Sequence, residues 1–182
     1  MAVTIDRVGS KNEVQTVEQD ADFERLFQEN WPRVNELLLR LLGDPDEAQD
    51  LALETFWRLH HHPPRQAHNL GGWLYRVALR LGYNALRAAR RRGQYEQEAG
   101  KLALEKSFND PAREVELAEQ RQRVRKVLAG LPPRTAQILV LRHSGFSYTE
   151  IGAALGVPGT SVGTLLVRAE KEFEERYLQT GE

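Results

Sequence analysis

The apolar residues of this 182-residue chain recur every three or four positions, and no segment alternates with the period of two that marks a strand. This spacing predicts an all-α protein. The first helix is predicted from Asp22, with Phe23, Leu26 and Phe27 on one face. Pro32 is expected to end or kink this helix, and its apolar stripe resumes and runs to Gly43.

A second helix is predicted directly after Gly43. Asp44 is a capping residue, Pro45 suits the first turn, and the acids that follow lie near the positive end of the helix dipole. The apolar face of this helix is Ala48, Leu51, Ala52, Thr55 and Leu59. A loop broken by two prolines follows, and Asn69 is positioned to cap a third helix that runs to about residue 92.

The rest of the pattern divides the chain into two small helical domains. Residues 1–20 lack an apolar stripe and are expected to form a disordered tail, and residues 21–92 form the first domain. Residues 93–111 are acidic and without a stripe, which predicts a flexible linker. The second domain, residues 112–182, begins with a helix that Leu131-Pro132-Pro133 ends, and a short helix over 134–143 follows.

Residues 147–168 predict a helix, a tight turn and a second helix. Ser147 and Glu150 have the spacing of a capping box, and Gly156 suits a left-handed helix end. Small residues at 152–154 would let the two helices approach closely, and a charged tail helix is expected to end near Tyr177. The pattern is typical of a DNA-reading helix-turn-helix, although an ordinary helical hairpin in a bundle has similar spacing.

The net charge of −1 hides a strong segregation of charge along the chain. Six arginines and no acid lie between residues 69 and 92, whereas acids dominate residues 1–68 and 93–120. Such blocks indicate separate surfaces for separate partners. One sector of the third helix carries Arg76, Arg80, Asn84, Arg87 and Arg91, a pattern that suits phosphate contacts.

Trp73 borders this arginine stripe and could stack on an unpaired base. The alternative is a solvated face with Trp73 in the core. On the second helix, Asp46, Asp50 and Glu54 form an acidic ridge at spacings of four residues, where like charges repel. A basic protein partner would explain the ridge, and a solvated face is the alternative.

Several kinds of chemistry are not expected. The chain has no cysteine, which excludes disulfides and thiolate metal sites, and its amino-terminal residues have no apolar signal block. The histidines at 60–62 and 68 lack helical ligand spacing, and no nucleophile motif or phosphate-binding loop is present. We therefore expect no catalytic residues, no metal and no cofactor, hence not an enzyme, and a cytoplasmic location without membrane insertion.

From Asp22 to Tyr177 the order of these segments resembles the extracytoplasmic-function (ECF) sigma factors, small two-domain initiation factors of bacterial RNA polymerase. GDPDEAQDLALETFWRL resembles the segment that binds polymerase, and GGWLYRVALRLGYNALRAARRR the helix that opens and reads the −10 element. LPPRTAQILVLRHSGFSYTEIGAALGVPGTSVGTLLVRA resembles the −35-reading domain.

The resemblance implies a sigma factor that directs polymerase core to promoters, contacting the β′ clamp region and the β flap, with promoter DNA and an anti-sigma factor as further partners. The implied polymerase-binding residues are Asp46, Asp50, Glu54 and Phe56. The implied −10 residues are Arg65, His68, Asn69, Trp73, Arg76, Arg80, Asn84, Arg87 and Arg91. The implied −35 residues are Arg134, Arg142, Ser147, Tyr148, Thr160, Ser161, Thr164 and Arg168.

The chain departs from the family pattern at several positions. The family usually has asparagine at Arg80, aspartate at Asn84 and glutamine at Leu53. Basic or polar residues usually stand at Gly163, Leu165 and Val167, so the recognition helix is expected to bind −35 DNA weakly. A helix-turn-helix regulator that binds duplex DNA without polymerase, and a helical adaptor that binds only protein, are the alternatives.

Overall fold

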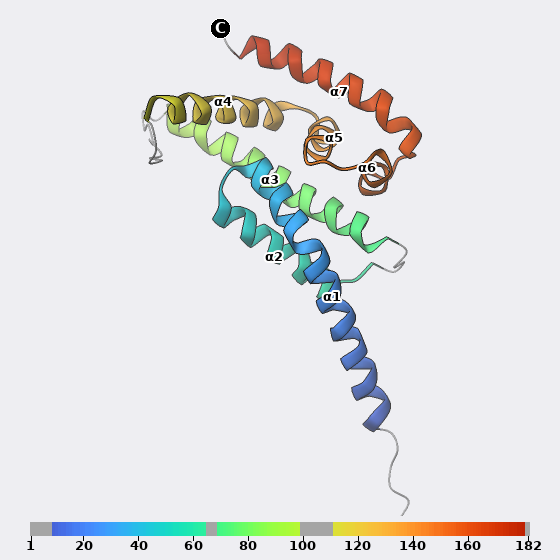
Figure 1. Cartoon of the computed structure of the whole chain (residues 1–182). Coiled ribbons are helices and arrows are strands. Elements are labelled where there is room, and N and C mark those ends of the chain that lie inside the picture. The colour runs from blue at the N-terminus through green and yellow to red at the C-terminus, as the bar shows by residue number, and fades with distance from the viewer. Residues whose placement is uncertain (1–8, 65–68, 99–110, 181–182) are drawn as a thin grey trace, which may run out of the picture.

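The computed structural model describes residues 9–64, 69–98 and 111–180, which form seven α-helices and no strand. These are α1 (Gly9–Leu42), α2 (Pro45–His61), α3 (Leu70–Glu98), α4 (Pro111–Gly130), α5 (Pro133–His143), α6 (Tyr148–Leu155) and α7 (Gly159–Gln179) (Figure 1). The predicted all-α fold is confirmed. We refer to α1–α3 as the first unit and to α4–α7 as the second unit.

The start of α1 differs from the expectation. Helix begins at Gly9, so the part of the expected disordered tail that the structure describes is helical. Residues 10–31 contain neither proline nor glycine, and extending an existing helix is far easier than nucleating one. The helix also continues through Pro32, which is exposed, and the buried stripe that follows, from Val34 to Leu41, offsets the lost hydrogen bond.

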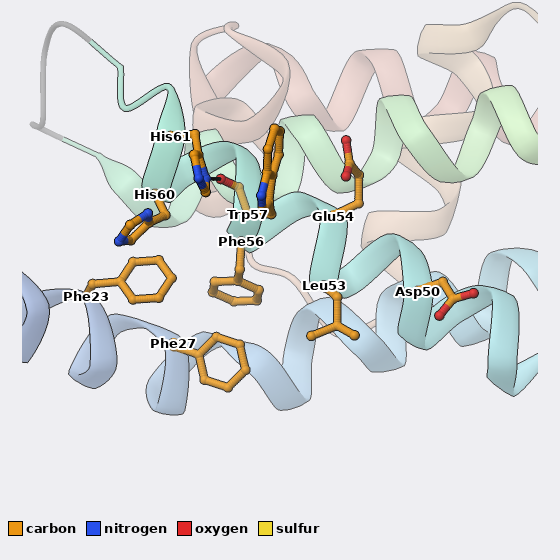
Figure 2. Close-up of a pocket in the computed structure, with 9 residues that line it drawn as sticks. All are labelled: Phe23, Phe27, Asp50, Leu53, Glu54, Phe56, Trp57, His60 and His61. Carbon is orange, nitrogen blue, oxygen red and sulfur yellow. Dashed lines mark hydrogen bonds between the residues drawn. The ribbon is translucent and has the colours of Figure 1, made fainter.

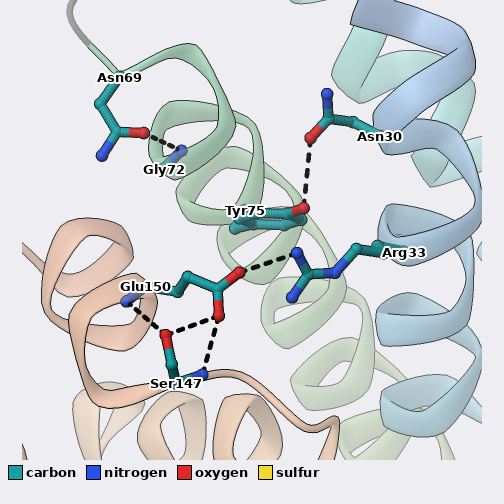
Figure 3. Close-up of polar contacts among 7 residues, drawn as sticks. All are labelled: Asn30, Arg33, Asn69, Gly72, Tyr75, Ser147 and Glu150. Carbon is teal, nitrogen blue, oxygen red and sulfur yellow. Dashed lines mark hydrogen bonds and ion pairs between the residues drawn. The ribbon is translucent and has the colours of Figure 1, made fainter.

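The two predicted helix caps of the first unit, Asp44 and Asn69, are confirmed. Asp44 Oδ1 accepts hydrogen bonds from the backbone N–H groups of Asp46 and Glu47 at 2.9 and 3.0 Å. Asn69 Oδ1 accepts from the Gly72 N–H at 2.7 Å (Figure 3). The predicted apolar face of α2 is buried, with Leu51 half-buried.

Helix α3 is buried on more than one side. Leu74 is buried, and Val77, Leu81, Ala85 and Ala88, which follow it at helical spacing, are half-buried. The helix is covered from two sides, since α1 and α2 pack against it in the first unit and α4 and α6 in the second. Its buried apolar positions are therefore Leu74, Tyr75, Ala78, Leu79, Tyr83 and Leu86. The helix also extends to Glu98, six residues into the segment expected to be a linker.

The predicted helix-turn-helix is present as α6 and α7, bent by 88° relative to each other. Ser147 and Glu150 form the full capping box, and Gly156 has a φ of 67°. A Cβ at Gly152 would lie 2.7 Å from the Val157 carbonyl oxygen, so the close approach requires glycine there. The expected recognition and tail helices are one continuous helix, α7.

One continuous core joins the two units, which the sequence pattern did not predict. Tyr83 of α3 donates a buried hydrogen bond to the Leu131 carbonyl oxygen between α4 and α5. Figure 1 shows α4 and α6 lying across α3. Among the described helices, no single one has the length and apolar content required to cross a membrane.

Candidate functional site

One face of α2 combines acidic and apolar side chains at the surface (Figure 2). Asp50, Leu53, Glu54 and Trp57 lie at spacings of three and four residues, which places them along one side of the helix. They line an open groove with Phe23 and Phe27 of α1. Leu53 is 48% exposed and Trp57 50%, which is unusual for large apolar side chains and marks a surface suited to a protein partner.

The proposed contact role of Phe56 is wrong. Its side chain is only 2% exposed, and its ring lies 4.7 Å from that of Phe27 and 5.9 Å from that of Trp31, between centroids. Phe56 therefore belongs to the core between α1 and α2. The exposed neighbours Leu53 and Trp57 were missed, although their spacing from Asp50 and Glu54 was a usable signal.

The three acids of the ridge differ in their surroundings. Asp46 lies in the first turn of α2, where the helix dipole favours negative charge. Glu54 forms an ion pair with Arg58, at 2.7 Å, which offsets its repulsion from Asp50. Asp50 is exposed and has no ion pair with any described residue. It is the carboxylate most available to a basic partner.

The arginine stripe of α3 lies at the surface, as predicted. Arg80, Asn84, Arg87 and Arg91 are exposed. Arg76 is engaged by the second unit: its Nε donates to the Ala154 carbonyl oxygen at 2.9 Å and its Nη2 to that of Ala153 at 3.0 Å.

The remaining members of the predicted −10 set are placed as follows. Trp73 is half-buried and packs against the core. The sequence allowed either a ring free to stack on a base or a ring inside the core, and the observed burial is intermediate. Asn69 is exposed at the start of α3, where it caps the helix. Arg65 and His68 lie outside the residues that the structure describes.

The residues predicted to contact −35 DNA form a less cationic surface. Thr160, Thr164 and Arg168 are exposed on α7, and Ser161 is half-buried. Arg134 donates to the Leu155 carbonyl oxygen at 3.2 Å. The Arg142 guanidinium lies 5.5 Å from the centre of the Tyr148 ring, which is 43% exposed. On the same helix as Arg168, Val167 is 66% exposed and apolar.

A polar cluster between the units was not predicted (Figure 3). Arg33 of α1 forms an ion pair with Glu150 of α6 at 2.8 Å, and the Ser147 N–H donates to the same carboxylate at 2.9 Å. The Ser147 backbone N–H and the Arg33 guanidinium together lower the pKa of Glu150 to about 2. Burial raises the pKa of Tyr75, whose hydroxyl donates to Asn30 Oδ1 at 3.3 Å. Arg33 and Glu150 are 117 residues apart, so helical spacing gave no signal for their ion pair.

The histidines make packing contacts. The His60 ring lies 5.0 Å from that of Phe23, and the His61 ring stacks 4.3 Å from that of Trp57. Within the described ranges, no group of three or more histidine and carboxylate side chains could hold a metal ion.

Comparisons with known proteins agree with the order of these surfaces. A family model described as Sigma-70 region 2 matches residues 26–92, and one described as Sigma-70, region 4 matches residues 121–173. These ranges contain the α2 and α3 surfaces and the helix-turn-helix, respectively. Together the two models cover more than half of the chain.

Curated relatives give the same result. The ECF RNA polymerase sigma factor SigE of Mycolicibacterium smegmatis is 30% identical over 84% of this chain, which spans 60% of the length of SigE. The RNA polymerase sigma-H factor of Pseudomonas aeruginosa is 29% identical over 76% of this chain and 77% of its own length. The RNA polymerase sigma factor CarQ of Myxococcus xanthus is 28% identical over 86% of this chain and 87% of its own length.

The fold is also found in a solved structure. The sigma factor RpoE of Bartonella quintana, crystallised in complex with the anti-sigma factor NepR, matches 87% of this chain and 97% of its own with a TM-score of 0.50 and 23% identity. The paired region 2 and region 4 matches, supported by the ECF relatives, lead to one conclusion: the chain belongs to the extracytoplasmic-function group of the sigma-70 family.

Proposed function

We propose that this chain directs bacterial RNA polymerase core to specific promoters and aids promoter opening at initiation. Sigma factors are initiation factors rather than enzymes, so the catalytic step belongs to the polymerase. The observation that carries the proposal is the exposed face of α2, where Asp50, Leu53 and Trp57 combine charge with apolar area inside the region 2 match. Such a face suits a partner surface that offers cations beside apolar side chains.

The −10 element is proposed to bind along α3. Arg80, Arg87 and Arg91 are exposed on one side of this helix and would neutralise phosphates, and Asn84 lies among them within reach of a base. The loop before α3 would complete this surface. Residues 21–92 then act as the polymerase- and −10-binding domain, residues 93–111 as the connection, and residues 112–182 as the −35-binding domain.

We propose that the −35 element binds at α7, with lower affinity than is usual for this family. Of the side chains exposed there, Thr160 and Thr164 are short, and Arg168 is the cation that can reach a phosphate or a guanine. Attachment of the first domain to polymerase would raise the effective concentration of the second at the promoter. Because the proposed partners are polymerase and promoter DNA, we infer that the chain acts in the cytoplasm.

An anti-sigma factor is a further proposed partner. The sigma factor RpoE of Bartonella quintana was crystallised with one. On this chain, the exposed Val167 of α7 offers apolar area where the family usually carries a DNA-reading side chain. This exposed apolar area suits contact with a protein partner better than contact with a DNA groove.

The test measures binding of the full chain to purified polymerase core. Asp50→Lys should weaken binding at least tenfold, because an unpaired exposed acid in the contact face becomes a repelling cation. Glu24→Lys, an equal charge change at an exposed position of α1, should leave the affinity unchanged. Equal affinities of wild type and Asp50→Lys would remove α2 from the proposed polymerase interface.

A further inference from the structure

Three arginines from two helices gather around the end of α4. Helix α4 packs against both α3 and α7 (Figure 1). Its last residue, Gly130, is approached by Arg90 of α3 and Arg176 of α7. A Cβ added to this glycine would lie 2.7 Å from Arg90 Nη1 and 3.8 Å from Arg176 Nη1. Arg87 lies within one helical turn of Arg90. We call Arg87, Arg90 and Arg176 the Gly130 cluster.

The buried side chain of Tyr83 lies close to all three charges. Its hydroxyl donates a hydrogen bond to the carbonyl oxygen of Leu131, the residue directly after Gly130. Burial raises the pKa of this hydroxyl, and the positive charges of the Gly130 cluster act in the opposite direction. The three guanidinium groups therefore lie within electrostatic reach of one oxygen, although they come from two helices.

The positive charge of the Gly130 cluster is only partly balanced. Arg176 donates to the Gly130 carbonyl oxygen at 2.7 Å through Nη1 and to the Glu172 carboxylate at 2.9 Å through Nη2. Arg87 and Arg90 are exposed, and neither has an ion pair with a residue that the structure describes. The Arg90 and Arg176 guanidinium groups repel each other across the end of α4, and a bound anion would relieve this repulsion.

The arrangement fits a phosphate group. Guanidinium groups match the geometry of phosphate oxygens and form short, charge-assisted hydrogen bonds with them. A terminal phosphate carries a charge of about −1.5 to −2 at pH 7 and has three acceptor oxygens, which suits three arginines. A phosphodiester in nucleic acid carries one charge, so it balances the cluster less well. Gly130 has no side chain to occupy the space between Arg90 and Arg176.

We propose that the Gly130 cluster binds a terminal phosphate group, as found in a phosphomonoester or a polyphosphate. The ligand is a free phosphate compound rather than promoter DNA, so this site is independent of the proposed sigma function. Glu172 competes with the phosphate for Arg176, because the carboxylate already accepts a hydrogen bond from this guanidinium. The affinity for phosphate therefore depends on both residues, in opposite directions.

The test is calorimetric titration of the full chain with sodium tripolyphosphate at constant ionic strength. Wild type should bind at one site. Arg90→Gln should weaken binding about tenfold, because one charge-assisted hydrogen bond is lost. Arg92→Gln, which makes the same charge change at an exposed position of α3 outside the cluster, should bind as wild type does. A wild type that does not bind, or equal losses in Arg90→Gln and Arg92→Gln, would overturn the proposal.

Two further variants separate the site from overall charge and from folding. Glu172→Gln should strengthen tripolyphosphate binding about threefold, whereas Glu174→Gln, the same change at an exposed position of α7, should not. Gly130→Ala should weaken binding and leave thermal unfolding unchanged, because its Cβ meets the mobile end of Arg90 and alanine favours helix. Equal gains in both glutamate variants would show a general charge effect and contradict the site.

The last arm distinguishes a terminal phosphate from a nucleic-acid backbone. A single-stranded oligonucleotide with hydroxyl ends is titrated into wild type and Arg176→Gln at the same ionic strength. Arg176→Gln should weaken binding of tripolyphosphate about tenfold and leave that of the oligonucleotide unchanged. Thermal unfolding of this variant, which also loses the bond to Gly130, identifies the folded fraction. Equal losses for the two ligands would assign the cluster to nucleic-acid backbone and overturn the proposal.

Discussion

Truncation of Trp57 gives the sharpest test of the α2 surface. The side chain is 50% exposed on the face that also carries Asp50 and Leu53. A tryptophan buries up to about 250 Å² when fully covered, so a partner that covers the exposed half gains roughly 100 Å². At about 25 cal/mol per Å² this area stabilises the complex by about 2.5 kcal/mol.

Trp57→Ala should therefore weaken binding to polymerase core by about 70-fold. The assay is a fluorescence titration of the labelled full chain with purified core. Because alanine is the best helix former and Trp57 lies at the surface, thermal unfolding should change little. Leu178→Ala, which truncates a 66% exposed side chain on α7, is the control and should bind as wild type does.

Phe56→Ala distinguishes a core residue from a contact residue on the same helix. Removal of this buried ring should lower the free energy of unfolding by about 3–5 kcal/mol, seen as an earlier urea transition. Normal core binding by Trp57→Ala would exclude Trp57 from the interface. Loss of binding by Phe56→Ala at wild-type stability would make Phe56 a contact residue rather than a core residue.

Three further predictions concern the turn between α6 and α7, the Arg33–Glu150 ion pair and the arginine stripe. Gly152→Ala should destabilise the chain by about 1–3 kcal/mol in urea unfolding, because its Cβ would meet backbone atoms, whereas Gly163→Ala, where the new Cβ makes ordinary contact, should be neutral or stabilising. The difference in free energy of unfolding between wild type and Glu150→Gln should be largest above about pH 4.5 and should disappear towards pH 2, because folding lowers the pKa of Glu150. A constant difference in urea titrations across this pH range would contradict this prediction. Arg80→Ala and Arg87→Ala should each weaken single-stranded −10 binding and reduce its logarithmic salt slope by about 0.7, and an unchanged slope would remove that residue from the phosphate contacts.

Local features of the fold were predictable because they depend on neighbours in sequence. Each helix cap depends on hydrogen bonds between residues no more than four apart in sequence. These are the capping box at Ser147, the caps at Asp44 and Asn69, and the left-handed helix end at Gly156. The order of the helices followed from apolar spacing for the same reason. Pro32 does not end α1, one of the two outcomes expected from the sequence, because burial of the stripe after it, a tertiary effect, outweighs its local preference.

Features that depend on long-range packing were not predictable. Spacing alone places Phe56 and Trp57 on adjacent parts of α2, and only the position of α1 decides that Phe56 is covered. Likewise Arg76 fits the arginine stripe by spacing, whereas its bonds to α6 require the second unit to lie across α3. The Arg33–Glu150 pair joins helices far apart in sequence, so no periodicity could indicate it.

The most direct test of the central claim is transcription in a purified system. Polymerase core is incubated with genomic DNA, with and without the full chain, and transcript 5′ ends are mapped. Defined start sites should appear only with the chain, share upstream −10 and −35 sequences, and disappear with Asp50→Lys but not with Glu24→Lys. If the start sites are identical with and without the chain, it does not direct polymerase to promoters.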